Sequence, residues 1–517
     1  MAHGDHPIEA LAPRSRMYQG PFGRLFPDLP PWPPVAMTDA EADVRFSALA
    51  RTMVERPGRS PAAIANAAKD RDSFDGTLPA GYTYFGQFVD HDITFDPASS
   101  LVRANDPNGL LNFRTPRLDL DNLYGRGPVD QPYLFHQGRF ITGAIVNAKG
   151  RPIRVPGLGT AKDPVFFADL PRNPHGRAII GDPRNDENVI VSQLQAAFLL
   201  AHNALVDRAV DAGASQRAAF EQARRTLRWL YQWIVWHDYL RRICEPAVWA
   251  SALQIGAPDA TGRRPVTLGF KDLYAWKQQP FMPVEFSVAA YRFGHSMIRT
   301  EYRTNLARGI DRHLPVFAPG ARADDLRGGG PVPLENAIEW DWFLPMETSA
   351  GAAGFPQRAH RIDTKVSNSL AALPDGNAPL PQRNLKRGWR FGLPSGSDVA
   401  RALGVAPVAI DPDHDALWLY ILTEAETTAR GRRLGTVGST IVAATIAGLL
   451  KGDPGSWLTV NAAWTPDDDP LLKPRDNRDG RADTPEHPWT LASIIRIAGV
   501  PFDAGPFGAA AGLPGGE

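Results

Sequence analysis

The most informative stretch of this sequence is GYTYFGQFVDHD, residues 81–92. If residues 84–92 form a helix, Gln87 and His91 stand four residues apart, and Asp90 projects from the same face. Asp92 is then turned by about 100° from His91, because each residue advances an α-helix by that angle. One short segment could therefore present His91 to one site and Asp92 to another. The alternative is an ordinary helix end with solvated carboxylates.

A second segment, TPRLDLDNLYG at residues 115–125, has possible oxygen donors at every second residue. These donors are Thr115, the carbonyl of Arg117, Asp119 and Asp121. In an extended loop, such spacing turns alternate groups to one side. Hard oxygen ligands in this arrangement suit Ca²⁺, which takes 6–8 of them. The alternative is a turn in which aspartate side chains bond their own backbone.

Two further segments, the second of them in two separated parts, contain polar residues beside apolar runs. GDPRNDEN (181–188) carries Arg184 and Glu187 three residues apart, although an acidic helix start would look similar. YRFGHSMI (291–298) contains His295, which on its own would be taken for a buried core histidine. RNLKRGW (383–389) contains Asn384 and Arg387, which alone indicate an ordinary polar turn.

Composition excludes several classes of protein. The 517 residues include 56 Lys and Arg and 56 Asp and Glu, and this balance argues against a nucleic-acid binder or a polybasic membrane-surface protein. Cys244 is the only cysteine, which excludes an intrachain disulfide and a cysteine-based metal cluster. We expect no transmembrane segment, because no apolar run approaches the ~18 residues that a span needs. The first residues lack the pattern of a secretory signal, so we expect a cytoplasmic protein, with export by a signal-independent route as the alternative.

Helical periodicity dominates the chain. The sequence predicts helices over 189–210, 218–244, 417–430 and 437–450, a short strand at 139–146, and a solvated loop over 465–488. Residues 1–36 are rich in proline, and we expect an arm over the surface that continues to about residue 60. We therefore predict a mainly α protein with long loops and little β structure, in which residues 1–60 form the arm and 61–517 one large domain.

Taken together and in this order, the four segments resemble those of the animal-type haem peroxidases of the peroxidase–cyclooxygenase superfamily, in a form similar to its bacterial members. The resemblance runs from about residue 80 to about residue 500 and includes WIVWHDYL (233–240) and LWLYILTEA (417–425). It implies that residues 61–517 form a helical haem peroxidase domain. It also implies reduction of hydrogen peroxide and oxidation of a small donor, a halide, thiocyanate or phenol, through an oxo-ferryl intermediate.

The resemblance also implies roles for individual residues. His91 is similar to the distal histidine, with Gln87 beside it, and Arg184 to the distal arginine. His295 is similar to the proximal ligand of the haem iron, and Asn384 to the residue that accepts its other ring N–H. Arg292 and Arg387 match positions near the haem propionates. Asp90 and Glu187 match carboxylates that in some members form esters to haem b. The family's calcium site is matched by Asp92, Thr115, Arg117, Asp119 and Asp121.

Two departures from the family pattern qualify the expected substrates and ligands. The chloride-oxidising member has Met directly after the ester-forming Glu, where this chain has Asn188. We therefore expect bromide, iodide, thiocyanate or phenols rather than chloride as donors. His202 stands in a changed motif, LAHNA, and we expect it to make structural hydrogen bonds. The sequence does not indicate the oligomeric state or the physiological donor.

Two alternatives to a peroxidase remain. A fatty-acid dioxygenase of the same superfamily uses a tyrosyl radical three residues before the proximal His, where this chain has Arg292. Tyr291 lies four residues before His295, and we expect it to point elsewhere on the helix, which favours a peroxidase. A non-catalytic binding or adhesion module with the same fold is the other alternative, and the presence of every distal and proximal residue argues against it.

Overall fold

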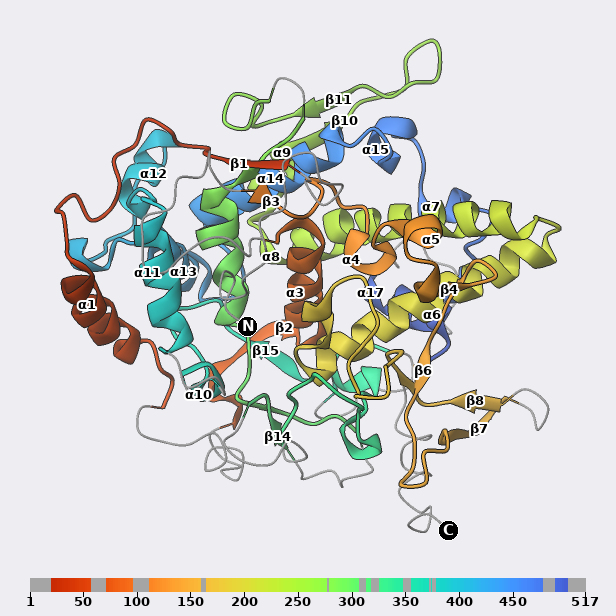
Figure 1. The fold of residues 1–517 in the computed structure, drawn as a ribbon. Helices are drawn as coiled ribbons and strands as arrows, with labels where there is room; N and C mark the ends of the chain where they lie inside the picture. The colour runs from red at the N-terminus through yellow and green to blue at the C-terminus, as the bar shows by residue number, and fades with distance from the viewer. Residues whose placement is uncertain are drawn as a thin grey trace.

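The computed structural model describes residues 20–56, 71–95, 111–159, 164–276, 279–305, 313–317, 325–346, 355–371, 373, 378–477 and 489–500. Helices dominate it, and the strands form small ribbons, of which β2 and β15 lie in the middle of the molecule beside α3 (Figure 1). The predicted fold class, mainly α with little β structure, is confirmed. The longer helices are α1 (Asp39–Thr52), α3 (Gly81–Ile93), α6 (Val189–Asp211), α7 (Gln216–Ile234), α11 (Leu380–Arg390), α13 (Leu417–Ala429), α14 (Thr436–Gly452) and α17 (Leu491–Ala498).

The remaining helices are short. They are α4 (Asp121–Tyr124), α5 (Gly127–Asp130), α8 (Arg241–Ile243), α9 (Pro246–Ala252), α10 (Asn368–Ala371), α12 (Gly396–Ala402), α15 (Trp457–Val460) and α16 (Pro474–Asn477).

The strands pair in one three-stranded and six two-stranded sheets among the described residues. The three-stranded sheet has the order β12 (Met282–Pro283), β1 (Gly20–Gly23), β3 (Leu111–Asn112). The two-stranded pairs are β2 (Asp75–Pro79) with β15 (Arg358–His360), β4 (Phe135–His136) with β5 (Arg139–Phe140), β6 (Gly143–Ala144) with β9 (Ala168–Asp169), β7 (Arg154–Gly159) with β8 (Pro164–Phe166), β10 (Leu253–Ile255) with β11 (Val266–Leu268) and β13 (Glu301–Tyr302) with β14 (Leu314–Pro315).

Helix α6 is the centre of the core. It packs against α7 and α17, and α3 crosses it. The Asn188 side chain caps its first turn by accepting a hydrogen bond from Val191 N at 2.9 Å, a contact that stabilises a helix by about 1 kcal/mol. By length and composition alone, α6 is the one helix among the described residues that could span a membrane, and polar residues interrupt its apolar run. However, 83% of its most apolar window is buried inside the protein, as in a core helix.

Helix α3 is almost entirely buried and owes its position to two glycines. A Cβ on Gly81 would lie 2.8 Å from the carbonyl oxygen of Phe343, and one on Gly86 would lie 2.3 Å from the hydroxyl of Tyr239. Gln87 and Asp90 are the only α3 residues that are not fully buried. The predicted helix over 84–92 is therefore confirmed, and it begins three residues earlier than predicted.

The predicted helix over 218–244 is interrupted. Helix α7 ends at Ile234, a π-helical turn follows over Val235–Leu240, and α8 completes the run. A π turn advances by less than 100° per residue, so it rotates the side chains that follow relative to a continuous α-helix. Here the turn brings Tyr239 against α3.

Residues 20–56 pack against the rest of the described fold. Helix α1, which the sequence did not predict, begins at a capping box between Thr38 and Glu41 and lies against α11. The buried carboxylate of Glu285 accepts hydrogen bonds from the backbone N–H groups of Leu25 and Phe26. The boundary near residue 60 between an arm and a domain stays a prediction.

Two local predictions are wrong. Residues 139–146 form two separate short strands, β5 and β6, which pair with different partners. Part of the predicted loop 465–488 is buried, because two of its carboxylates bind side chains of α6 and α7. Asp476 pairs with Arg208, and Asp469 accepts a hydrogen bond from Thr226. Residues 478–488 of that prediction lie outside the described residues.

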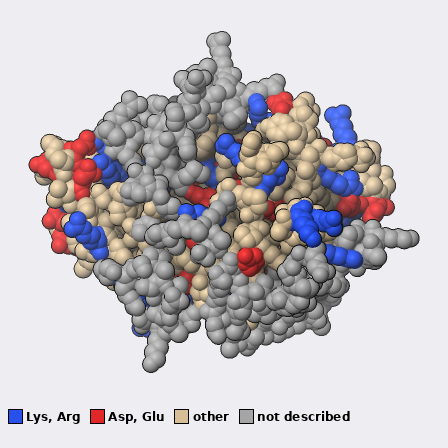
Figure 2. All heavy atoms as spheres, turned by 60° about the horizontal axis from the view of Figure 1, so that its bottom comes forward, with Lys and Arg blue, Asp and Glu red and all other residues tan. Residues whose placement is uncertain are grey.

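Charges of both signs occur over the described part of the face that Figure 2 shows. This distribution agrees with the equal numbers of acidic and basic residues in the sequence.

Candidate active site

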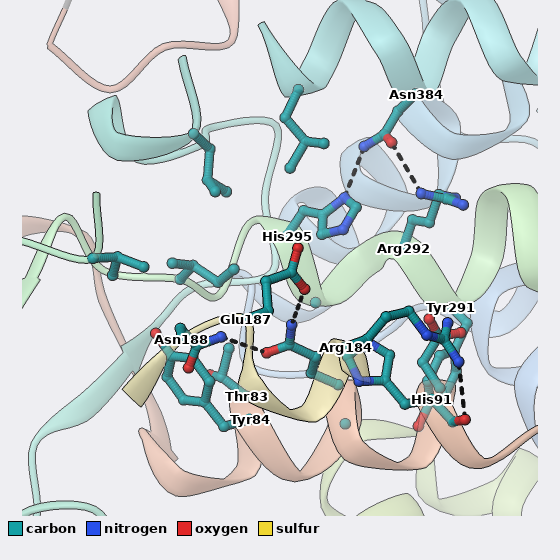
Figure 3. A pocket seen from close by; sticks show the side chains of 18 of the residues that line it. Thr83, Tyr84, His91, Arg184, Glu187, Asn188, Tyr291, Arg292, His295 and Asn384 are labelled. Carbon is teal, nitrogen blue, oxygen red and sulfur yellow. Dashed lines mark hydrogen bonds between the residues drawn. The ribbon is translucent and has the colours of Figure 1, made fainter. Parts of the chain in front are cut away.

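One cavity collects every residue that the sequence predicted around a haem. Its walls come from α3, the segment 184–188, the helical turns before His295, and α11 (Figure 3). The predicted residues that line it are Gln87, Asp90, His91, Arg184, Glu187, Arg292, His295, Asn384 and Arg387. His91 on α3 and His295 lie on opposite sides of this space (Figure 3).

His91 is held in one orientation by a residue that the sequence analysis missed. Its Nδ1 lies 2.7 Å from Oδ1 of Asn185, and Nδ2 of Asn185 donates to Oε1 of Gln195 at 2.8 Å. The amide oxygen of Asn185 therefore faces His91, so Nδ1 carries the proton and Nε2 keeps a lone pair. Burial, with Arg184 nearby, lowers the pKa of His91 to about 3, which keeps the ring neutral.

Arg184 is fixed on three sides. Its guanidinium donates to both oxygens of Asp182 and to the carbonyl oxygens of His91 and Thr94, the latter two at 3.0 and 2.8 Å. Burial alone would raise the pKa of Asp182, but Arg114 and Arg184 hold it well below its usual range. The Asp182 carboxylate is therefore ionised and pairs with the Arg184 guanidinium. Nη1 of Arg184 is buried and has no hydrogen-bond partner among the described residues.

Gln87 is oriented by two neighbours from the segment before α6. Its Nε2 donates to Oε2 of Glu187 at 3.2 Å, and its Oε1 accepts from Nδ2 of Asn188 at 3.1 Å. Asn188 thus caps α6 through its oxygen and orients Gln87 through its nitrogen. The amide of Gln87 is held at the rim of the cavity, beside His91 on the same helix.

His295 contacts Asn384, but in the reverse sense to the predicted one. Nδ2 of Asn384 lies 2.8 Å from Nδ1 of His295, while Oδ1 accepts from Nη1 of Arg292 at 3.4 Å. The predicted orientation had the amide oxygen accepting the ring N–H. The difference has an electrostatic reason, because the positive charge of Arg292 attracts the amide oxygen.

Tyr291 lines the same cavity, so the expectation that it points elsewhere is wrong. A π turn covers Glu285–Ala289 and ends at Ala289, whose backbone angles (φ −126°, ψ −73°) are not helical. A 3₁₀ helix over Ala290–His295 follows. In a 3₁₀ helix each residue advances by about 120°, which turns Tyr291 to another wall than His295. Burial, together with Tyr239, raises the pKa of Tyr291 well above its usual value, so its hydroxyl stays protonated.

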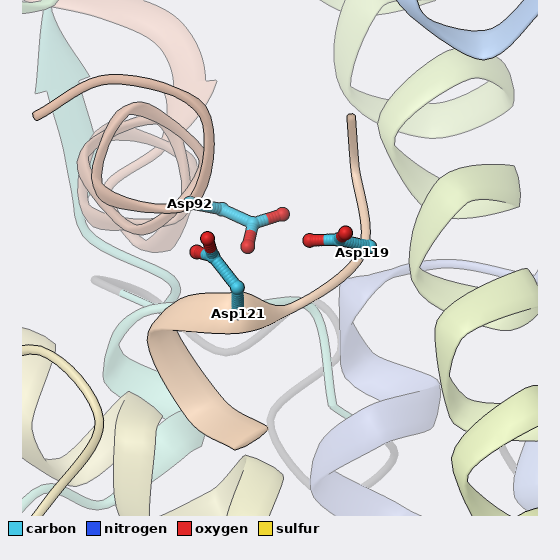
Figure 4. A group of neighbouring side chains, drawn as sticks. All are labelled: Asp92, Asp119 and Asp121. Carbon is cyan, nitrogen blue, oxygen red and sulfur yellow. The ribbon is translucent and has the colours of Figure 1, made fainter. Parts of the chain in front are cut away.

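Three carboxylates of the predicted calcium site converge. Oxygens of Asp92, Asp119 and Asp121 lie within 4.8 Å of one another, and their side chains point toward a common centre (Figure 4). Thr115 is part of the group, because its Oγ1 donates to Asp119 at 2.8 Å and its N to Asp121 at 3.3 Å. The side chain of Arg117 points away, toward Asp453.

The charge of these carboxylates is balanced only in part, by Arg114, whose Nη1 lies 3.5 Å from Oδ1 of Asp121. Burial, followed by Asp121 and Asp119, raises the pKa of Asp92 well above its usual value. Burial raises the pKa of Asp121 to about 8, although Arg114 opposes the shift. Oδ1 of Asp92 is buried and has no hydrogen-bond partner in the part of the chain that the structure describes. A divalent cation at the common centre would relieve this repulsion, so the donor set fits calcium.

The sequence did not predict two residues that line the cavity and two that bind lining residues by hydrogen bonds. Asn185 and Asp182 flank Arg184 in the sequence, and this proximity was the one available signal. Tyr239 and Arg383 also line the cavity. Both lie in segments that the sequence analysis quoted, 233–240 and 383–389, but no role was assigned to them. Arg383 adds a third arginine to the wall that Arg292 and Arg387 provide.

His202 makes structural hydrogen bonds, as expected. Its Nδ1 lies 2.9 Å from the hydroxyl of Tyr124, and its Nε2 lies 3.0 Å from the carbonyl oxygen of Gly138. Rings of Phe140 and Phe220 surround it. Both ring nitrogens are thus occupied away from the cavity.

Comparisons with known proteins show which family and which fold the chain resembles. A family model for the animal haem peroxidase domain matches residues 101–407. Thyroid peroxidase of Sus scrofa is 26% identical over 387 residues, which cover 68% of this chain and 38% of that protein. The chain spans less than half the length of curated relatives such as this one.

Two solved structures share the fold. Peroxidase A from Dictyostelium discoideum has a TM-score of 0.55 at 16% identity, and the match covers 86% of this chain and 89% of that one. A fatty acid alpha-dioxygenase from Arabidopsis thaliana has a TM-score of 0.50 at 15% identity, with 83% and 72% covered. At these identities the likeness concerns the fold alone.

Proposed function

The chain belongs to the animal haem peroxidase family, and on that premise we propose that it binds haem between His91 and His295 and reduces hydrogen peroxide with electrons from a small donor. The observation that carries the proposal is the convergence of these two histidines on one cavity from segments about 200 residues apart. His91 is buried and neutral, as a base must be, while His295 contacts Asn384 as the proposed iron ligand.

The cavity fits a haem in three respects. One wall presents an imidazole, the side chain type that holds iron in many haem proteins. The arginines 292, 383 and 387 suit the carboxylates of haem propionates. Arg184 also lines the cavity, and its buried Nη1, which has no partner among the described residues, is a donor left for a polar ligand atom. Asp90 and Glu187 lie at the rim, where we propose that they form esters to the haem.

The distal residues would divide the proton chemistry between them. When bound, haem supplies the iron that takes up peroxide and the electrons that cleave its O–O bond. Nε2 of His91 takes the proton from one peroxide oxygen and returns it to the other, which leaves as water. Arg184 stabilises the negative charge that develops on the leaving oxygen, and its fixed position means that no reorganisation is needed.

The contact between His295 and Asn384 must change when iron binds. A histidine that ligates iron through Nε2 carries its proton on Nδ1 and needs an acceptor there. A 180° rotation of the Asn384 amide would bring Oδ1 to that position and Nδ2 to Arg292. A propionate could then replace the amide oxygen as the partner of Arg292. We also propose that calcium binds Asp92, Asp119 and Asp121, and so fixes the end of α3 next to His91.

Bromide, iodide, thiocyanate and phenols are the proposed donors. Asn188 occupies the position whose Met forms a haem link in the chloride-oxidising member, and here its amide caps α6 and orients Gln87. The test is a steady-state screen of these donors with peroxide on haem-replete protein. We expect peroxide-dependent oxidation that falls by orders of magnitude in His91→Ala and is unchanged in His136→Ala, an exposed control. Equal rates in both variants would refute the proposal.

The position of Tyr291 keeps a fatty-acid dioxygenase as the second candidate. This tyrosine lines the cavity, and the dioxygenase fold is shared. Oxygen uptake with linoleate separates the two functions. We expect no oxygen uptake beyond the rate that free haem gives. Oxygen uptake that disappears in Tyr291→Phe would favour the dioxygenase.

A further inference from the structure

A buried tyrosine outside the cavity has an acid–base partner that the peroxidase reaction does not use. The hydroxyl of Tyr82, in the first turn of α3, donates to Oδ2 of Asp238 at 2.6 Å. Both side chains are almost fully buried, at 1% and 2% exposure. Asp238 lies in the π turn after α7, and it also accepts from Arg242 Nε and from Leu491 N. The carboxylate therefore has a fixed position and one oxygen directed at the phenol.

Tyr239 connects this pair to the cavity. Its ring stacks on that of Tyr82, with centroids 6.5 Å apart and planes 7° from parallel. Tyr239 itself lines the cavity, and its hydroxyl fits against α3 only because residue 86 is a glycine. Two parallel aromatic rings at this separation are close enough for an electron to pass from one to the other. Tyr82 and Tyr239 thus form a short path from the haem site to Asp238.

The electrostatics of Tyr82 decide how it could be oxidised. Burial, followed by the charge of Asp238, raises the pKa of Tyr82 well above its usual value, so the phenol is protonated. The guanidinium of Arg242 lies 4.9 Å from the ring centroid, and a cation over the ring disfavours a second positive charge on it. An electron can therefore leave only as the proton leaves. Asp238 is positioned to accept that proton.

We propose that Tyr82 is a redox-active residue, which gives an electron through Tyr239 to the peroxide-oxidised haem while its proton moves to Asp238. The inference rests on the proposed function, because hydrogen peroxide is the oxidant that reaches the haem. In this step the O–H bond of Tyr82 breaks and an O–H bond to Oδ2 of Asp238 forms. Tyr82 becomes a neutral tyrosyl radical, and the oxidised haem is reduced by one electron. The protein would thereby hold an oxidising equivalent outside the cavity when no small donor is present.

Freeze-quench electron paramagnetic resonance tests this proposal. Haem-replete protein is mixed with hydrogen peroxide without a donor, and the optical spectrum of the haem is recorded in parallel. We expect a radical signal that changes its hyperfine pattern when the protein contains ring-deuterated tyrosine, and that narrows in D₂O because the hydrogen bond to Asp238 persists. Tyr82→Phe should abolish the signal. The control Tyr124→Phe removes another buried hydroxyl, bonded to His202, and should leave it unchanged.

Two further variants separate the parts of the path. Tyr239→Phe keeps the stacked ring but raises its oxidation potential, so the Tyr82 signal should be lost although the haem still reacts with peroxide. Asp238→Asn keeps a hydrogen-bond acceptor but not a base, and should also abolish the signal. A tyrosyl signal of unchanged shape in Tyr82→Phe would overturn the proposal, and so would a haem that is oxidised without any tyrosyl signal in the unaltered protein. If peroxide leaves the haem spectrum unchanged, the proposed function itself fails, and the role of Tyr82 fails with it.

Discussion

Nδ1 of His91 on α3 lies 2.7 Å from Oδ1 of Asn185, which comes directly after Arg184 in the sequence. The same pair of adjacent residues therefore orients the proposed base and supplies the positive charge. Because Asn185 is in turn held by Gln195, the ring of His91 has one tautomer with Nε2 toward the cavity. This relationship links the acid–base chemistry to the start of helix α6.

Replacement of Asn185 by Ala should slow the reaction with peroxide without loss of haem. The variant removes the acceptor of His91 Nδ1–H, and a buried donor left without a partner costs about 1–3 kcal/mol. Since 1.4 kcal/mol corresponds to about tenfold, we expect a decrease of roughly 10- to 100-fold. Stopped-flow measurement of the second-order rate constant at fixed pH gives the value.

Asn185→Asp is the informative companion to that variant. It keeps the acceptor but adds a negative charge, which raises the pKa of His91 and should move the acid limb of the rate profile to higher pH. A rate and profile identical to those of the unaltered protein in both variants would show that Asn185 has no part in positioning His91.

The reaction with peroxide should depend little on pH in the range where free histidine titrates. Burial, then Arg184, lowers the pKa of His91 from 6.5 to about 3, so the neutral base persists as the pH falls through 6.5. We expect the rate constant to decrease only as the pH approaches 3, or as the fold is lost. A midpoint near 6.5 would contradict the burial of His91 as the cause.

His295→Ala should weaken haem binding, whereas His91→Ala should not. The first variant removes the proposed iron ligand and one of the two hydrogen-bond contacts of Asn384. Titration with haem, followed at the Soret band, gives both affinities and the ligation spectrum. His414→Ala, at an exposed position, is the control. An unaltered histidine-type spectrum in His295→Ala would assign the ligand elsewhere.

Removal of calcium should lower the melting temperature. Asp92, Asp119 and Asp121 repel one another when no cation lies between them, and water screens the charge only weakly because Asp92 is buried and the other two are half-buried. A chelator should therefore lower Tm, and added Ca²⁺ should restore it. In Asp121→Asn the response to Ca²⁺ should shrink, while Asp207→Asn, at an exposed ion pair, should respond normally. An equal response in both would place calcium at another site.

Haem should resist extraction by acid acetone after turnover with peroxide. Asp90 and Glu187 lie at the rim of the cavity, and each is proposed to form one ester. Asp90→Asn and Glu187→Gln should each release more haem than the unaltered protein, and the double variant should release all of it. Full extraction from the unaltered protein after repeated turnover would show that neither ester forms.

The sequence was sufficient to predict the helices whose apolar residues recur with a helical period. Helices α6, α13 and α14 follow the apolar runs that predicted them, although α6 and α14 are buried on nearly all sides rather than on one face. Helix α1 and the π turns were not predicted. A π turn is stable only where neighbouring side chains, such as Tyr239 against Gly86, hold it. Local propensity carries no signal for such a turn.

The sequence by itself determined the residue types of the site, because chemistry needs particular side chains in an order that the chain displays. Only the tertiary structure decided their partners. It set Asn185 against His91, turned the amide of Asn384 toward Arg292, and brought Tyr291 into the cavity. Partners of this kind come from segments that are distant along the chain, so they exist only when long-range packing has closed the core.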